Sequence, residues 1–202
     1  DIEKNGGYLR LSDFEQYTPI VHDMAMSGTY RGLDVSGVGG PCGGPPVFEI
    51  LNILNSFDLA AMEHGSADFL HTMIESVKLA SVDRFSFMGD PAIYGFPIDV
   101  LADPEYAKSR AKEIDSASAQ DFSAGDPWSY AGVLKPADFP APGGIAPDDG
   151  TTHLTTADKS GNMVALTQTN VAFSGVLNPG VGVMMNDAMS WSVPVPGTVN
   201  SI

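Results

Sequence analysis

Two threonines, Thr151 and Thr169, flank a segment with the pattern of a β-hairpin. Residues 151–157 and 163–169 are rich in Thr, Val and Leu, and residues 158–162 between them (Asp-Lys-Ser-Gly-Asn) form a turn sequence. A three-residue loop would pair residues whose numbers sum to 320, so that Thr151 faces Thr169. Opposed Cβ atoms lie roughly 4.5–5.5 Å apart, which allows the two hydroxyls to hydrogen-bond.

Such a threonine pair has two interpretations. The simpler one is an ordinary Thr pair on a sheet. The alternative is a nucleophile, because a threonine at a chain terminus can be activated by its own α-amino group acting as the base. This chemistry requires a cut before Thr151, and the Gly- and Pro-rich approach that ends at Gly150 is the kind of segment in which a break is tolerated.

Composition argues against several other functions. The chain has 202 residues, ten Lys and Arg and a formal net charge of −15, so it lacks the basic surface that nucleic-acid binding needs. No stretch approaches the roughly 18 consecutive apolar residues of a membrane span. The four histidines have no metal-ligand spacing, and the one cysteine, Cys42, is expected to be packed. We therefore predict neither a metal nor a cofactor.

Three helices are expected before the hairpin. The first follows a Gly- and Pro-rich run, the second runs from Ser66, as its N-cap, to about Arg84, and the third covers Asp103–Ile114. The predicted apolar face of the first helix consists of Val47, Ile50, Leu51, Leu54 and Phe57. That of the second consists of Leu70, Met73, Ile74 and Val77. Residues 116–150 predict an exposed, flexible linker.

The chain is thus expected to have two parts, a mostly helical one over 1–150 and a β-rich one over 151–202. From Ser160 to Ile202 the only charged residue is Asp187. A tail this poor in charge needs further chain or a partner to cover it, so we expect the sequence to be an interior segment of a longer protein.

Short motifs also occur in a distinctive order. They are Lys4-Asn5-Gly6-Gly7, Tyr30-Arg31-Gly32, Glu49-Ile50-Leu51-Asn52-Ile53-Leu54, Ala80-Ser81-Val82-Asp83-Arg84, Gly89-Asp90-Pro91 and the run from Thr151 to Asn162. Together they resemble the γ-glutamyltranspeptidases of the N-terminal nucleophile (Ntn) hydrolase superfamily over nearly the whole chain. The resemblance implies an α+β fold that is part of a four-layer αββα sandwich. Residues 1–150 would be the end of the large subunit, and residues 151–202 the start of the small one.

The resemblance also implies a mechanism. The precursor would cut itself between Gly150 and Thr151, and the two subunits would stay associated. Thr151 would attack a small γ-glutamyl or related amide and form an ester, with its freed amine as base, and pass the acyl group to an acceptor amine or water. Thr169 would hold the Thr151 hydroxyl. His153 is expected to have a structural hydrogen-bonding role, because the amine already supplies a base.

Four residues are implied at the substrate site. Asn170 would bind the α-carboxylate, although it stands one residue earlier than in the family, and Asn186 and Asp187 lie in a run that resembles Gly-Ile-Leu-Leu-Asn-Asn-x-Met. Trp191 stands where glutathione-using members have an Asp that neutralises the substrate ammonium. It would offer a cation–π face, or the pocket would accept a different acyl group.

These implications leave three functions open. They are a γ-glutamyltransferase or hydrolase, an amide acylase of the same superfamily, and a structural or binding segment without activity. Other parts of the family's active site lie outside this sequence, so the chain alone is expected to be inactive. The family also suggests a periplasmic or extracellular location.

Overall fold

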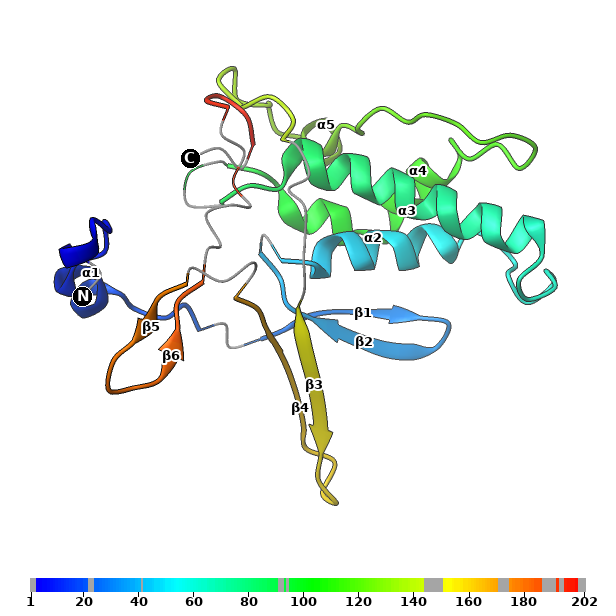
Figure 1. Ribbon diagram of the computed structural model, residues 1–202. Helices are drawn as coiled ribbons and strands as arrows, with labels where there is room; N and C mark the ends of the chain where they lie inside the picture. Colours follow the sequence, from blue (N-terminus) through cyan, green and yellow to red (C-terminus); the bar gives the residue numbers. More distant parts are fainter. Residues whose placement is uncertain are drawn as a thin grey trace. The chain divides into compact units, whose positions relative to one another are not determined.

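Figure 1 shows the computed structural model, which describes residues 3–21, 24–40, 42–90, 93, 95–143, 151–170, 175–186, 192 and 195–199. The chain divides into two compact units. The first, which we call the hairpin unit, consists of Asp1–Val21, Ile145–Pro194 and Ile202. The second, which we call the helical unit, consists of His22–Gly144 and Val195–Ser201. These units are defined by contacts between residues and not by where the backbone is cut. The predicted subunit boundary between Gly150 and Thr151 therefore stays a prediction.

Five helices build the described part of the helical unit. They are α2 (Gly44–Leu54), α3 (Ala67–Phe87), the 3-10 helix η2 (Ile98–Ala102), α4 (Pro104–Ala111) and α5 (Pro127–Ala131). Helix α2 packs against α3, α4 and η2, and it runs beside α3 in Figure 1. The core residues at this contact are Ile53, Leu79, Ala107 and Ala111, with Phe57, Ile114 and Phe122 packed around them. Burial of this apolar surface holds the helices together.

Two helix starts agree with the sequence prediction. The Ser66 hydroxyl accepts a hydrogen bond from the N–H of Phe69 at 3.2 Å. Asp103 Oδ1 accepts from the N–H groups of Glu105, at 2.8 Å, and Tyr106, at 3.2 Å. Both side chains satisfy backbone donors that have no partner inside the helix, which is why these residues begin α3 and α4.

The buried faces of α2 and α3 differ from the predicted ones. Leu54 is buried as expected, but Val47, Leu70, Ile74 and Val77 are 49%, 49%, 55% and 43% exposed. Helix α3 instead buries a largely polar face, which consists of Thr72, Glu75, Ser76, Leu79, Ala80, Asp83, Ser86 and Phe87. Its carboxylates are tolerated inside because cations and N–H groups pair with them, and a count of apolar positions does not detect such a face.

A β-hairpin that was not predicted from the sequence precedes α2. Strands β1 (Met26–Tyr30) and β2 (Leu33–Gly37) pair antiparallel through a two-residue turn. Arg31 and Gly32 at the turn have φ angles of 51° and 83°, as a type I′ turn requires. Cys42, just beyond this hairpin, is exposed rather than packed.

The segment predicted as a linker over 116–150 contains a packed element. Trp128 of α5 is 3% exposed. Its ring meets those of Phe87, Phe96 and Phe139 at centroid distances of 5.1, 5.5 and 4.6 Å. The segment is therefore not exposed throughout, because Phe87 and Phe96 from earlier in the chain and Phe139 from the segment itself pack on this tryptophan. Its last residues lie outside the described part.

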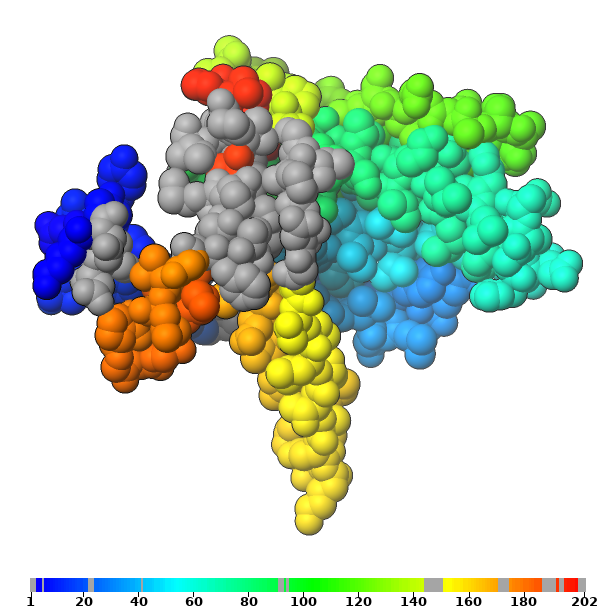
Figure 2. All heavy atoms as spheres, in the orientation of Figure 1, coloured from blue at the N-terminus to red at the C-terminus, as the bar shows by residue number. Residues whose placement is uncertain are grey.

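The hairpin unit contains short elements. They are η1 (Glu3–Asn5), α1 (Leu11–Gln16), β3 (Thr152–Ala157), β4 (Met163–Gln168), β5 (Leu177–Asn178) and β6 (Val183–Met184). β3 pairs with β4 and β5 with β6, both antiparallel. Every residue of β3 and β4 is exposed, and Figure 2 shows this hairpin as yellow and yellow-orange spheres. The chain is thus a mixed helix and strand structure, as predicted.

Candidate active site

Asp158 shapes the turn of the β3–β4 hairpin. Its Oδ1 accepts hydrogen bonds from the N–H groups of Ser160, at 2.8 Å, and Asn162, at 3.0 Å, and its Oδ2 accepts from the Asn162 side chain at 2.8 Å. These bonds, chiefly those from Asn162, hold the pKa of Asp158 below its ordinary value. Gly161 has a φ of 85°, a left-handed conformation that suits glycine. The turn is therefore defined by its own side chains.

The register of β3 and β4 is the predicted one. The ladder runs from Thr152 paired with Gln168 to Ala157 paired with Met163. In each pair the two residue numbers sum to 320, as a three-residue loop requires. A slip by one residue would turn every side chain to the other face, so this register decides which groups lie together.

Thr151 and Thr169 lie just outside the ladder, at the open end of the hairpin. Thr151 precedes β3 and is exposed, whereas Thr169 follows β4 and is half-buried. Continuing the register by one step sets Thr151 opposite Thr169, on the face that also carries His153. The roles of nucleophile and orienting hydroxyl stay predictions.

His153 is held between two hydroxyls on this face. Its Nδ1 lies 2.7 Å from Thr167 Oγ1 on the opposite strand, and its Nε2 lies 3.1 Å from Thr155 Oγ1 on its own strand. Both contacts agree with the hydrogen-bonding role expected for this histidine. Thr155 and Thr167 were not predicted as its partners, although the register and the alternation of side chains identify both.

Two of the four residues predicted to bind substrate belong to the described part. Asn170 is half-buried after β4, and Asn186 is exposed after β6. Asp187 and Trp191, together with Gly150 of the predicted cleavage site, lie outside the described residues. Substrate binding by all four residues stays a prediction.

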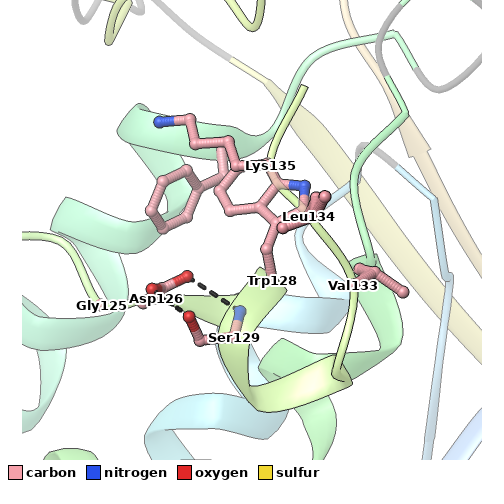
Figure 3. Close-up of a pocket in the computed structure, with 8 residues that line it drawn as sticks. Gly125, Asp126, Trp128, Ser129, Val133, Leu134 and Lys135 are labelled. Atoms are coloured by element: carbon pink, nitrogen blue, oxygen red, sulfur yellow. Dashed lines mark hydrogen bonds between the residues drawn. The ribbon is translucent and has the colours of Figure 1, made fainter. Parts of the chain in front are cut away.

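The helical unit has a hollow of about 320 Å³, drawn in Figure 3. Its lining residues are Phe87, Gly125, Asp126, Trp128, Ser129, Val133, Leu134 and Lys135. Ser129 Oγ donates to Asp126 Oδ2 at 2.6 Å, and the Ser129 N–H donates to Asp126 Oδ1 at 3.0 Å, so this pair caps α5. No histidine is among the lining residues. In this hollow Ser129 is engaged in the cap of α5.

The described ranges contain neither a metal-binding cluster nor a membrane-spanning helix. No three His, Cys, Asp or Glu side chains gather there as a metal site. None of the helices in those ranges is long and apolar enough to cross a bilayer.

Comparison with known proteins gives consistent matches. The family model for gamma-glutamyltranspeptidase matches residues 1–201. The glutathione hydrolase proenzyme of Escherichia coli (strain K12) is 35% identical over 99% of this chain and 33% of its own length. The acylase ACY 1 proenzyme of Pseudomonas sp. (strain V22) is 33% identical over 98% of this chain and 33% of its own. Among solved structures, the cephalosporin acylase from Bacillus halodurans has a TM-score of 0.76 at 28% identity, over 100% of this chain and 33% of that one.

The extent of these matches settles the family. The chain spans about a third of the length of the curated relatives it matches, and within that third the similarity runs from end to end. The two curated relatives are named as proenzymes, one a glutathione hydrolase and the other an acylase. With a family model that covers residues 1–201, the chain belongs to the γ-glutamyltranspeptidase family.

Proposed function

We propose that the full-length protein that carries this chain is an amidase with Thr151 as its N-terminal nucleophile. The observation that carries this proposal is the β3–β4 register, because its extension by one residue would pair Thr151 with Thr169. Family membership supports it, and the proenzyme names of the relatives agree with a cut between Gly150 and Thr151. The substrate is a small γ-glutamyl amide or a related acyl amide.

The proposed reaction has two acyl-transfer steps. The free amine of Thr151 takes the proton of its own hydroxyl while Oγ attacks the amide carbonyl carbon. The C–N bond breaks, the leaving amine takes that proton, and the acyl group remains on Thr151 as an ester. An acceptor amine or water then attacks the ester and restores the hydroxyl. The Thr169 hydroxyl orients Thr151 Oγ throughout.

We also propose that both units belong to a four-layer αββα sandwich. Residues 1–150 end the large subunit and residues 151–202 begin the small subunit, and the two subunits stay associated after the cut. Every residue of β3 and β4 is exposed in this chain, including the apolar ones. This supports the sandwich, because the other layers of the full-length protein would cover these apolar side chains.

Trapping the acyl-enzyme tests the nucleophile. The full-length protein is mixed with a slowly turned-over γ-glutamyl or glutaryl ester and digested, and the peptides are analysed by mass spectrometry. The acyl mass is expected on Thr151. Thr151→Ala should lose both the adduct and the activity, whereas the neighbouring substitution Thr152→Ala should keep both. An adduct on another residue contradicts the proposal, and a protein with neither adduct nor activity favours the structural role.

A second candidate is an acylase with a different acyl group. The observation that favours it is Trp191, at the position where the family resemblance predicts an aspartate, together with the similarity to the acylase ACY 1 proenzyme. Losing a charged hydrogen bond to a substrate ammonium costs about 1.5–3 kcal/mol, or roughly tenfold to 150-fold in kcat/KM.

A comparison of γ-glutamyl and glutaryl anilides distinguishes the two candidates. Trp191→Asp should move the preference of the full-length enzyme toward the γ-glutamyl compound, because only that compound carries the α-ammonium. A wild-type enzyme that already prefers γ-glutamyl by several hundredfold would contradict the role given to Trp191.

A further inference from the structure

A cluster of buried charges joins three helices at the centre of the helical unit. Asp83 on α3 is 0% exposed and accepts three hydrogen bonds. The donors are the Tyr106 hydroxyl, at 2.7 Å, the Gly125 N–H, at 2.7 Å, and Arg110 Nη2, at 3.3 Å. An ionised carboxylate has about four lone-pair sites, so these three donors leave roughly one site on Asp83 without a hydrogen bond, on the side where Arg110 Nε lies 3.3 Å from Oδ2.

Arg110 on α4 is the buried cation of this cluster. Its side chain is 5% exposed, and its Nε lies 3.3 Å from Asp83 Oδ2. Its Nη1 donates to Glu113 at 2.6 Å, but the Glu113 side chain is 44% exposed. The buried charges of Arg110 and Asp83 therefore cancel, and Glu113 lies at the solvent-exposed side of the cluster.

Glu49 on α2 is a second buried carboxyl beside this pair. It is 0% exposed, and within the described ranges neither of its oxygens accepts a hydrogen bond. The charge of Asp83 and a side-chain hydrogen bond to it are among the effects that raise the pKa of Glu49, so the two buried carboxyls act on each other. An ionised Glu49 would add a second negative charge next to Asp83 in the interior, and among the described residues no N–H or O–H group bonds to its oxygens.

We propose that Glu49 is a neutral carboxylic acid whose O–H donates to the open acceptor site of Asp83, so that one buried proton ties α2 to α3. This proton satisfies the hydrogen bonding of Glu49 and leaves the cluster electrically balanced. Release of the proton leaves two adjacent carboxylates sharing a single buried arginine. The helical unit therefore becomes less stable as pH rises, independently of any catalytic function.

The titration of the surrounding groups agrees with this assignment. Burial, then the charge of Asp83 and the hydrogen bond to it, raise the pKa of Glu49 well above its ordinary value, and the opposing charge of Arg110 is the smaller effect. Burial and the charge of Asp83 also raise the pKa of Tyr106, so its hydroxyl stays protonated. Asp83 on α3, Tyr106 and Arg110 on α4 and Glu113 beside Arg110 are the titratable groups around Glu49.

The sign of the pH effect follows from linkage. An unfolded glutamate releases its proton above a pKa of about 4.3, whereas the folded protein keeps the proton on Glu49 to higher pH. The stabilisation is therefore complete below the unfolded pKa and is lost as pH rises toward the folded pKa. Over that range one proton changes the unfolding equilibrium constant by about tenfold per pH unit.

The chain offers a matched control in Glu75, which is also buried. Glu75 Oε1 accepts from Lys78 Nζ at 2.8 Å, and Oε2 accepts from the Gln120 N–H at 3.1 Å. Burial raises the pKa of Glu75, but these hydrogen bonds and the charge of Lys78 outweigh it and leave the pKa below its ordinary value. Glu75 is thus ionised in both folded and unfolded states near neutral pH and contributes no slope there.

Hydrogen exchange on the full-length protein tests the proposal between pH 5.5 and 7.5. The opening constants of amides in α2, α3 and α4 are measured for wild type, Glu49→Gln and Glu75→Gln. Glutamine at 49 keeps a neutral donor, so the wild-type opening constant should rise relative to Glu49→Gln by up to about tenfold per pH unit. Glu75→Gln should open more readily than wild type but with the same pH slope.

Equal slopes for wild type and Glu49→Gln would overturn the proposal. If Glu49→Gln does not fold, infrared spectroscopy of wild-type protein with 13C-labelled glutamate supplies a second measurement. A protonated glutamic acid C=O band at pH 7 is expected, and its absence would equally overturn the assignment.

Discussion

Replacing Asp83 with Asn is expected to weaken the helical unit by about 3–5 kcal/mol, the usual effect of breaking one side of a buried ion pair. Asp83 is fully buried, and its Oδ2 lies 3.3 Å from Nε of Arg110, whose side chain is 5% exposed. Asparagine keeps one oxygen as an acceptor but removes the charge. While Glu49 keeps its proton, the guanidinium is then buried with the half-exposed Glu113 as the ionised carboxylate that remains in the described part of the cluster.

Hydrogen exchange of α3 and α4 amides in the full-length protein measures this loss. Arg110→Met is the second arm, and Asp83→Asn combined with Arg110→Met is the third. The double variant should lose clearly less than the sum of the single losses, because it leaves no uncompensated cation. A loss below about 1 kcal/mol for Asp83→Asn, or single losses that simply add, would refute this account of the cluster.

Three further substitutions test other parts of the structure. Thr169→Val removes the hydroxyl that we propose orients Thr151 and should lower kcat of the full-length enzyme by about tenfold to a thousandfold. The same change at Thr156, on the other face of β3, should leave kcat unaltered, and equal effects would contradict the role proposed for Thr169. Ser66→Ala should destabilise the first turn of α3 by about 1 kcal/mol in hydrogen exchange, and unchanged protection there would count against the cap. Gly32→Ala, at a φ of 83°, should lower the stability of the β1–β2 hairpin by roughly 1 kcal/mol in the same measurement. Gly95→Ala is the control, because Gly95 has open space around it and no positive φ. Equal losses for the two variants would argue against strain at the turn.

The hairpin that carries the candidate site was predictable because its information is local. The Asp158 to Asn162 turn sequence sets the loop length, and loop length sets the register. The cross-strand partners of Thr152 and His153 follow from that register alone. Family membership was predictable for a similar reason, since the motifs retain their order along the chain.

The buried face of α3 was not predictable, because its partners come from elsewhere. Inside the protein Asp83 accepts hydrogen bonds from Arg110 and Gly125, and Glu75 accepts one from the N–H of Gln120. All three donors are distant in sequence from the carboxylates. An apolar count assigns such positions to solvent. The burial of Trp128 within the expected linker depends in the same way on Phe87 and Phe96, which precede that linker in the sequence.

The N-terminus of the small fragment tests the central claim most directly. The full-length protein is purified, its chains are separated, and the smaller one is sequenced from its amino end, with its mass measured intact. We expect a fragment that begins Thr151-Thr152-His153, and we expect Thr151→Ala to stay a single chain. A wild-type protein that is fully active while uncut, or a fragment that begins at another residue, would contradict the account.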